Sequence, residues 1–183
     1  MNGYRLFGGA DVNFAKKNGP TPLYGVANSV SLEACKYLIS VGADVNKSAY
    51  KLQWQYTSFK CHAGDGGGPL YYAALNCNVE LCQCLLEGVD VDVEANVLRG
   101  FTPLHIAACK GHLDTVKHLI SVGGVISKNN NDGKTPKQVA RKIYMIQYLK
   151  SVEEEREEVA RRFKRARIED DDDEEEEENN DEE

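Results

Sequence analysis

Apolar residues recur at helical spacing in short segments that glycine and proline residues separate. Residues 102–123 are the clearest example, because they predict two helices with one apolar face each. Thr102 is a favourable N-cap, Pro103 suits the first turn of a helix, and Gly111 is a common residue at a helix end. Each helix is too short to be stable alone, so the pattern predicts a helical hairpin that packs against others. The apolar faces consist of Leu104, Ala107 and Ala108 in the first helix, and Leu113, Val116, Leu119 and Ile120 in the second.

The same arrangement repeats along the chain. A glycine stands three residues before each of four regularly placed prolines, and the intervals between these prolines are 47, 34 and 33 residues. A unit that recurs at about 33 residues is typical of solenoid proteins, in which neighbouring repeats bury each other's apolar faces. The sequence therefore predicts an all-α fold of stacked helix-turn-helix units. The four prolines are Pro22, Pro69, Pro103 and Pro136.

The recurring segments resemble the consensus of the ankyrin repeat family over roughly residues 8–152. The segment TPLHIAA at 102–108, with Gly111-His112 after it, is similar to the first half of that consensus. The segment GADVN at 42–46 is similar to the end of a repeat and occurs again at 9–13. The resemblance implies an ankyrin-repeat solenoid with β-hairpin loops. It also implies a non-catalytic module or adaptor that binds a partner protein through its hairpin tips and inner helices.

The resemblance, together with the charge pattern beyond it, suggests how the chain is divided. We expect a partial N-terminal repeat at 1–13, a repeat array at 14–152, a charged helix at 153–168 and a disordered acidic tail at 169–183. The first segment lacks the first helix of a repeat, so it is either a truncated end or a frayed half-repeat. Within the array we expect repeats near 19–46, 66–92 and 100–126, an insertion at 47–65, and a capping repeat at 133–152.

The insertion is rich in aromatic residues. Trp54 and Tyr56 alternate with glutamines, which predicts a β-hairpin arm. Such an arm either contacts a partner as a binding hot spot or folds back onto the neighbouring repeat. The predicted protein-binding residues are Trp54, Tyr56, Phe59, Arg99 and Phe101.

Charge divides the chain into two parts. Residues 169–183 hold 13 of the 29 acidic side chains and no basic one, so the remaining 16 acidic and 22 basic residues leave a net charge of +6. Such a run cannot bury apolar surface and is predicted to be disordered. The acidic run either binds basic proteins such as histones or only increases solubility. Binding of basic clients by a nuclear protein is therefore the alternative function.

A basic cluster precedes the acidic run. Residues 164–167 resemble a short nuclear import signal, in which Lys164, Arg165 and Arg167 supply the charge. Alternatively, these cations complement the end of the charged helix or pair with the acidic run. The pairs Glu157–Arg161 and Glu158–Arg162 have the spacing and order that stabilise a helix.

The sequence indicates no catalytic or metal chemistry. Cys109 and His112 have a metal-like spacing, but zinc needs four converging ligands. The repeat alignment instead assigns Cys35 and Cys82 to the buried position of Val116. We therefore expect no enzyme activity, no metal and no cofactor. We expect the thiols to be reduced and the protein to be intracellular, in the cytoplasm or the nucleus.

Other properties narrow the partners. The sequence contains no stretch of 18 apolar residues, so it predicts no membrane-spanning segment. The basic residues are mostly scattered, which does not favour binding of nucleic acid. We expect a monomer whose partner is a protein that the sequence does not identify. Asn46 lies in a segment that resembles sites of asparagine hydroxylation in ankyrin repeats, although a structural turn asparagine is the alternative.

Overall fold

The computed structural model describes residues 9–15, 20–29, 31–47, 67–87, 91–95 and 99–180, with side chains as far as Arg167 except that of Asn28. The chain comprises two compact units, Met1–Ile146 and Gln147–Glu183. Within the described ranges the chain forms eight helices. They are α1 (Pro22–Ser29), α2 (Leu32–Ser40), α3 (Pro69–Leu75), α4 (Val79–Leu86), α5 (Pro103–Lys110), α6 (Leu113–Ser121), α7 (Pro136–Val139) and α8 (Ile143–Asn180).

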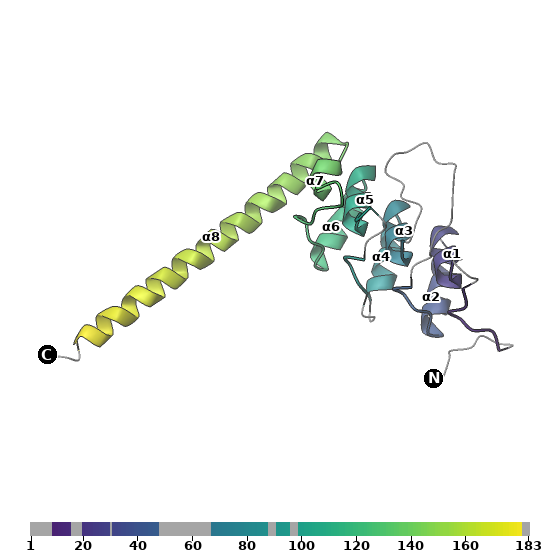
Figure 1. Ribbon diagram of the computed structural model, residues 1–183, viewed down its shortest axis with the longest axis horizontal. Coiled ribbons are helices and arrows are strands. Elements are labelled where there is room, and N and C mark those ends of the chain that lie inside the picture. Colours follow the sequence, from purple (N-terminus) through teal and green to yellow (C-terminus); the bar gives the residue numbers. More distant parts are fainter. Residues whose placement is uncertain are drawn as a thin grey trace. The chain divides into compact units, whose positions relative to one another are not determined.

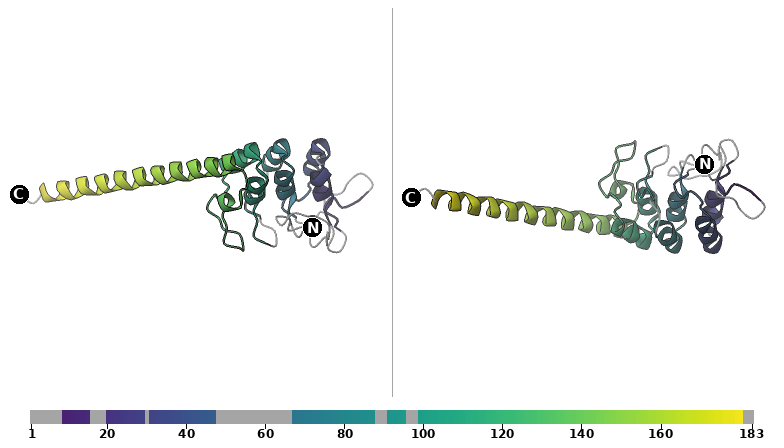
Figure 2. Two further views of the ribbon diagram at one scale, coloured as in Figure 1. Left: turned by 90° about the horizontal axis from the view of Figure 1, so that it is seen from above. Right: turned by 90° about the horizontal axis from the view of Figure 1, so that it is seen from below.

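The helices of the first unit form two rows (Figure 1). The inner row consists of α1, α3, α5 and α7, each in contact with the next, and the outer row of α2, α4 and α6. The loop between α6 and α7 leaves the stack on one side (Figure 2). The predicted all-α solenoid of stacked helical hairpins is thus confirmed.

Small residues allow the inner helices to pack closely. Ala73 and Ala74 in α3, and Ala107 and Ala108 in α5, are completely buried. The outer row is packed through one recurring position, where Cys35, Cys82 and Val116 are likewise completely buried. The predicted burial of these two cysteines is confirmed, and they serve as small apolar core residues.

The ends of α5 are well satisfied. The Thr102 side chain accepts from the His105 N–H, and His105 Nδ1 accepts from the Thr102 N–H, so the two residues form a capping box. At the other end, Gly111 has φ 82° and its N–H donates to Ala107 and Ala108. The predicted cap and helix end are both confirmed.

Other repeats are less regular. Cys77 occupies the position of Gly111 and adopts φ 60°. This conformation is energetically unfavourable for any residue that has a Cβ atom. Gly68 replaces the threonine cap before α3 and makes no side-chain cap hydrogen bond. Val30, which holds the position of Gly111 and Cys77 in an earlier repeat, lies outside the described residues.

Two expectations need correction. The helix α8 continues to Asn180, whereas the sequence predicted a disordered tail from residue 169. Residues 143–180 contain no glycine or proline, and glutamate favours helix, which explains the continuation despite charge repulsion. The loops at 9–15, 41–47 and 91–95 are turns rather than β-hairpins, and no strand is assigned within the described ranges.

Candidate functional site

The turns at the ends of successive repeats are joined by a ladder of hydrogen bonds. The Asn13 side-chain oxygen accepts from the Asp44 N–H at 2.7 Å, and that of Asn46 accepts from the Asp92 N–H at 3.0 Å. The third step is made by Glu94, whose carboxylate accepts from the Val125 N–H at 2.9 Å. The ladder fixes each of these described turns to the next repeat, so the turns form one ordered edge.

Local hydrogen bonds shape each of these turns. The Asp11 carboxylate accepts from the N–H two residues later, and the carboxylates of Asp44 and Asp92 do the same in the next turns. Such side-chain-to-backbone bonds are the reason that aspartate is favoured in turns. The GADVN segments therefore have a structural role that the sequence spacing alone did not specify.

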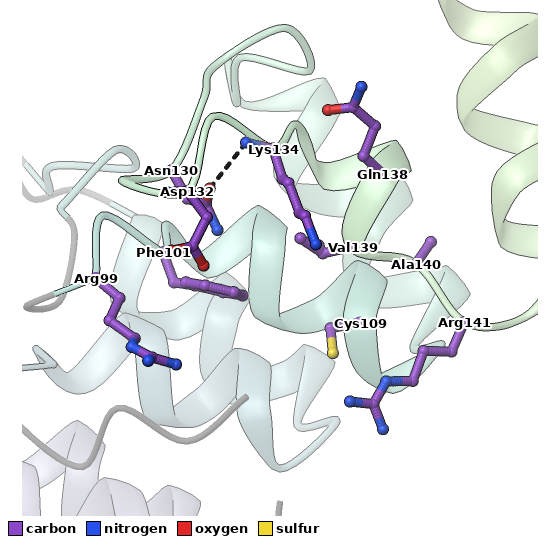
Figure 3. A pocket seen from close by; sticks show the side chains of 10 residues that line it. All are labelled: Arg99, Phe101, Cys109, Asn130, Asp132, Lys134, Gln138, Val139, Ala140 and Arg141. Carbon is purple, nitrogen blue, oxygen red and sulfur yellow. Dashed lines mark hydrogen bonds between the residues drawn. The ribbon is translucent and has the colours of Figure 1, made fainter. Parts of the chain in front are cut away.

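A pocket of about 400 Å³ lies at the C-terminal end of this edge. Its walls come from the residues before α5, from α5 itself, from the turn before α7 and from the end of α7 (Figure 3). All of these segments belong to the first compact unit. The lining residues are Arg99, Phe101, Cys109, Asn130, Asp132, Lys134, Gln138, Val139, Ala140 and Arg141.

Backbone hydrogen bonds hold the pocket's two turns together. The Asn131 N–H donates to the Arg99 carbonyl at 2.9 Å. Across the turn, the Asn130 N–H donates to the Lys134 carbonyl at 2.9 Å, and the same carbonyl lies 3.0 Å from His105 Nε2. Because these bonds link consecutive repeats, the pocket is formed by the fold and does not depend on a ligand.

The His105 ring is placed by its partners. Its Nδ1 accepts from the Thr102 N–H, so the proton of the neutral ring belongs on Nε2, which donates to Lys134. Burial lowers the pKa of His105 below its usual value, and the hydrogen bond to Lys134 opposes this shift. His105 is therefore a neutral ring that holds the Lys134 backbone and contacts Phe101, two residues that line the pocket.

The pocket combines an apolar floor with a charged rim. Phe101 and Cys109 are buried at 7% and 5% exposure, whereas Arg99, Lys134 and Arg141 are exposed. In Figure 3 the Phe101 ring lies between Arg99 and Lys134, and Arg141 lies beyond Cys109. Asp132 contributes the opposite charge, so the rim carries a net charge of +2. An apolar floor with a few polar groups is typical of binding sites.

Two of the five predicted binding residues line this pocket. Arg99 is exposed on its rim. Phe101 is mostly buried, with its ring 5.6 Å from that of His105, so it forms a wall of the pocket and does not protrude. Trp54, Tyr56 and Phe59 lie outside the described residues.

Sequence reasoning did not identify Asn130, Lys134 and Arg141 as site residues. The repeat period contained a signal for two of them, because Asn130 and Lys134 lie close to one repeat length after Arg99 and Phe101. Equivalent turns of adjacent repeats lie side by side in a solenoid. Arg141 gave no such signal, since it follows a four-residue helix whose early end the repeat pattern did not predict.

Nucleophile and metal chemistry have little support in the described residues. Burial raises the pKa of Cys35 to about 11 and that of Cys82 to about 12, which leaves both thiols protonated at neutral pH. His112 Nε2 lies 3.2 Å from the Leu75 carbonyl, and burial lowers the pKa of this ring. No cluster of three or more metal-ligating side chains occurs in that part of the chain.

The remaining predicted sites are exposed. Lys164, Arg165 and Arg167 lie on exposed positions of α8. Asn46 is exposed as well, but its side chain already accepts the hydrogen bond from Asp92. Among the described helices, none is both long and apolar enough to cross a bilayer.

Comparison with known proteins agrees with this geometry. The two rows of helical hairpins define a helical repeat solenoid with an ordered edge of turns. The model of ankyrin repeats in three copies matches residues 3–95 and 70–157. The chain therefore belongs to the ankyrin repeat family, whose repeats are generally non-catalytic and mediate protein–protein interaction.

Several curated proteins share the repeats. The chain is 31% identical to alpha-latroinsectotoxin-Lt1a of Latrodectus tredecimguttatus over 125 residues, which cover 68% of this chain and 8% of the toxin. It is 33% identical to the NF-kappa-B p105 subunit of Gallus gallus over 55% of this chain and 9% of that protein. Protein phosphatase 1 regulatory subunit 27 of Homo sapiens is 38% identical over 39% of this chain and 46% of its own length. The matches thus span less than half of these relatives.

Proposed function

We propose that this chain is a non-catalytic adaptor that binds a partner protein along its edge of turns and inner helices. The observation that carries the proposal is the pocket between the turns of consecutive repeats, with Arg99 on its rim and Phe101 in its wall. The family's general role in protein–protein interaction supports the same conclusion. We further propose an intracellular location, a monomeric state and a contribution from Trp54, Tyr56 and Phe59.

Affinity capture with the full chain tests this proposal. A variant of the edge, Arg99→Ala/Arg141→Ala, is compared with a variant of the outer helices, Tyr37→Ala/Lys117→Ala, whose positions are also exposed. Surface substitutions of this kind change stability little, so both variants should remain folded. The proposal predicts that partners captured by the unmodified chain are lost with the edge variant and kept with the outer variant.

The opposite result would sink the proposal: partners retained by the edge variant and lost with the outer one. A third variant, Trp54→Ala/Tyr56→Ala, tests the insertion separately. Unchanged capture with this variant would remove the insertion from the binding surface while leaving the edge in place.

A second candidate function is a nuclear protein that binds basic clients through residues 169–183. It is supported by the acidic run and by the exposure of Lys164, Arg165 and Arg167 on α8. Removal of residues 169–183 should then abolish capture of basic proteins, and binding should fall sharply with ionic strength. If every partner survives the deletion, this candidate is wrong.

A further inference from the structure

We propose that the pocket between 99–101 and 130–141 is a site for a carboxylate side chain of an acidic segment in the partner protein. This inference rests on the proposed function, because it specifies the chemistry of the partner at the same surface. It is carried by three features of the pocket: the charge of its rim, an unpaired amide in its wall and its apolar floor.

The rim is cationic. Arg99, Lys134 and Arg141 surround the opening, and Asp132 is the one acidic side chain that lines this pocket. Arginine and lysine attract carboxylates, and arginine adds a planar pair of donors that matches the two carboxylate oxygens. The excess of two positive charges therefore favours an acidic ligand over a neutral or basic one.

The Asn130 amide is a buried donor in the wall of the pocket. Asn130 is 5% exposed, and its side-chain oxygen accepts from the N–H groups of Asp132 (3.0 Å) and Lys134 (2.9 Å). This arrangement fixes the orientation of the amide group. Its Nδ2 has no hydrogen-bond partner among the described residues. A buried donor without an acceptor costs free energy. Because Nδ2 is covered in the folded chain, a carboxylate oxygen would satisfy it once the neighbouring side chains shift.

The size and floor of the pocket add a second requirement. A volume of about 400 Å³ exceeds that of a single carboxylate. Phe101, Cys109 and Val139 offer apolar surface next to the cations. The pocket therefore fits an acidic residue followed or preceded by an apolar one, as in a segment of aspartates or glutamates with an interspersed aromatic or aliphatic residue.

Direct binding of defined peptides to the full chain tests this chemistry. The probe is a fluorescein-labelled peptide with four glutamates around one phenylalanine, and its match replaces every glutamate by glutamine. Fluorescence anisotropy at about 50 mM NaCl should show at least about tenfold tighter binding of the glutamate peptide, and higher salt should reduce this preference.

Substitutions then assign the preference to the pocket. Arg99→Gln/Arg141→Gln should weaken binding of the glutamate peptide by about tenfold. The matched control Lys36→Gln/Lys117→Gln removes the same charge from exposed positions of α2 and α6, so it should change affinity by less than about twofold.

Asn130→Asp tests the amide without removing the turn. The new carboxylate still accepts from the N–H groups of Asp132 and Lys134, but the Nδ2 donor is lost. Gln138→Glu adds the same charge at the exposed rim and keeps an acceptor for the cap of α7. Asn130→Asp should weaken binding by about fivefold or more, and Gln138→Glu by only about twofold. A thermal melt confirms that both variants are folded.

Equal affinity for the two peptides, or the same loss with the control pair as with the rim pair, would overturn the inference. Equal effects of Asn130→Asp and Gln138→Glu would also contradict the role of the amide. These failures differ from failure of the adaptor proposal. In that case the captured partner would be insensitive to edge substitutions, whatever the two peptides do.

Discussion

Cys77 and Gly111 hold equivalent positions between the two helices of their repeats, and both have positive φ. Gly111 adopts φ 82° without a steric cost, whereas the Cβ atom of Cys77 makes φ 60° unfavourable. Asn78 follows and caps α4 by accepting from the Leu81 N–H, which holds the strained residue in place. The strain at Cys77 is thus sustained by its neighbours.

Cys77→Gly should therefore stabilise the protein. Relief of the left-handed strain is worth about 1–2 kcal/mol, and the greater freedom of glycine in the unfolded chain offsets part of it. The expected net gain is about 1 kcal/mol in the free energy of unfolding, measured by urea denaturation. Cys77→Ala keeps the Cβ atom and should give no comparable gain; an equal gain from both variants would show that the thiol, not the backbone, is responsible.

His105 links stability to pH. Its pKa is lowered by burial, so the unfolded chain binds a proton more readily than the folded chain does. Its contribution to stability is complete above the unfolded pKa of about 6.5, and it is lost as pH falls through the lower folded pKa. Protonation of Nδ1 would also remove the acceptor for the Thr102 N–H.

A His105→Gln variant tests this linkage. Glutamine supports the same capping box in α7, where the Gln138 side chain accepts from the Thr135 N–H. The variant should lose about 1 kcal/mol at pH 7.5 because the bond to Lys134 is missing. Its melting temperature should fall less between pH 7.5 and pH 5.5 than that of the unmodified chain. Parallel pH profiles would mean that His105 does not contribute to the acid sensitivity.

At the scale of elements, the turns before α5 and α7 position the pocket. Gly100 and Gly133 lie at the ends of these turns and have the same φ of 71°. A Cβ atom at Gly100 would lie 2.5 Å from the Asn131 side-chain oxygen and 2.9 Å from the Asn131 nitrogen, whereas one at Gly133 would meet nothing within 4 Å. A substitution at Gly133 therefore introduces backbone strain alone, whereas one at Gly100 introduces the same strain and a steric clash with the next repeat.

Alanine substitutions at these two glycines should have unequal effects. Gly133→Ala should cost about 1 kcal/mol, the strain of a positive φ alone. Gly100→Ala should cost about 2–3 kcal/mol or more, because the turn of the next repeat must also move. Chemical denaturation of both variants measures the difference. Equal costs would indicate that the contact between the turns contributes nothing to stability.

Much of this element structure was predictable from the sequence, because it depends on local rules. The cap at Thr102 and the burial of Cys35 and Cys82 follow from spacing and helix chemistry. The pocket was not predictable, because it requires two turns about one repeat apart to lie side by side. The end of α8 was mispredicted because charge repulsion was given more weight than the helix propensity of residues 169–180.

At the scale of the whole molecule, charge is distributed unevenly along the sequence. The first 168 residues carry a net charge of +6, whereas residues 169–183 are strongly acidic. The proposed site for acidic segments lies in the basic part, on an edge that the hydrogen-bond ladder holds in order. Residues 153–167 are stabilised by their own ion pairs, including Glu157–Arg161 at 3.2 Å and Glu158–Arg162 at 3.1 Å. The two ion pairs that the sequence spacing predicts within this helix are thus confirmed.

The central claim is that the edge of turns with its pocket is the surface that contacts the partner. Hydrogen–deuterium exchange of the full chain, with and without a protein recovered by affinity capture, tests it most directly. We predict slower exchange at 99–105 and 130–141 in the complex and no change in the outer helix α6 (Leu113–Ser121). Protection confined to the outer helices or to residues 150–167, with the pocket segments unchanged, would contradict the account.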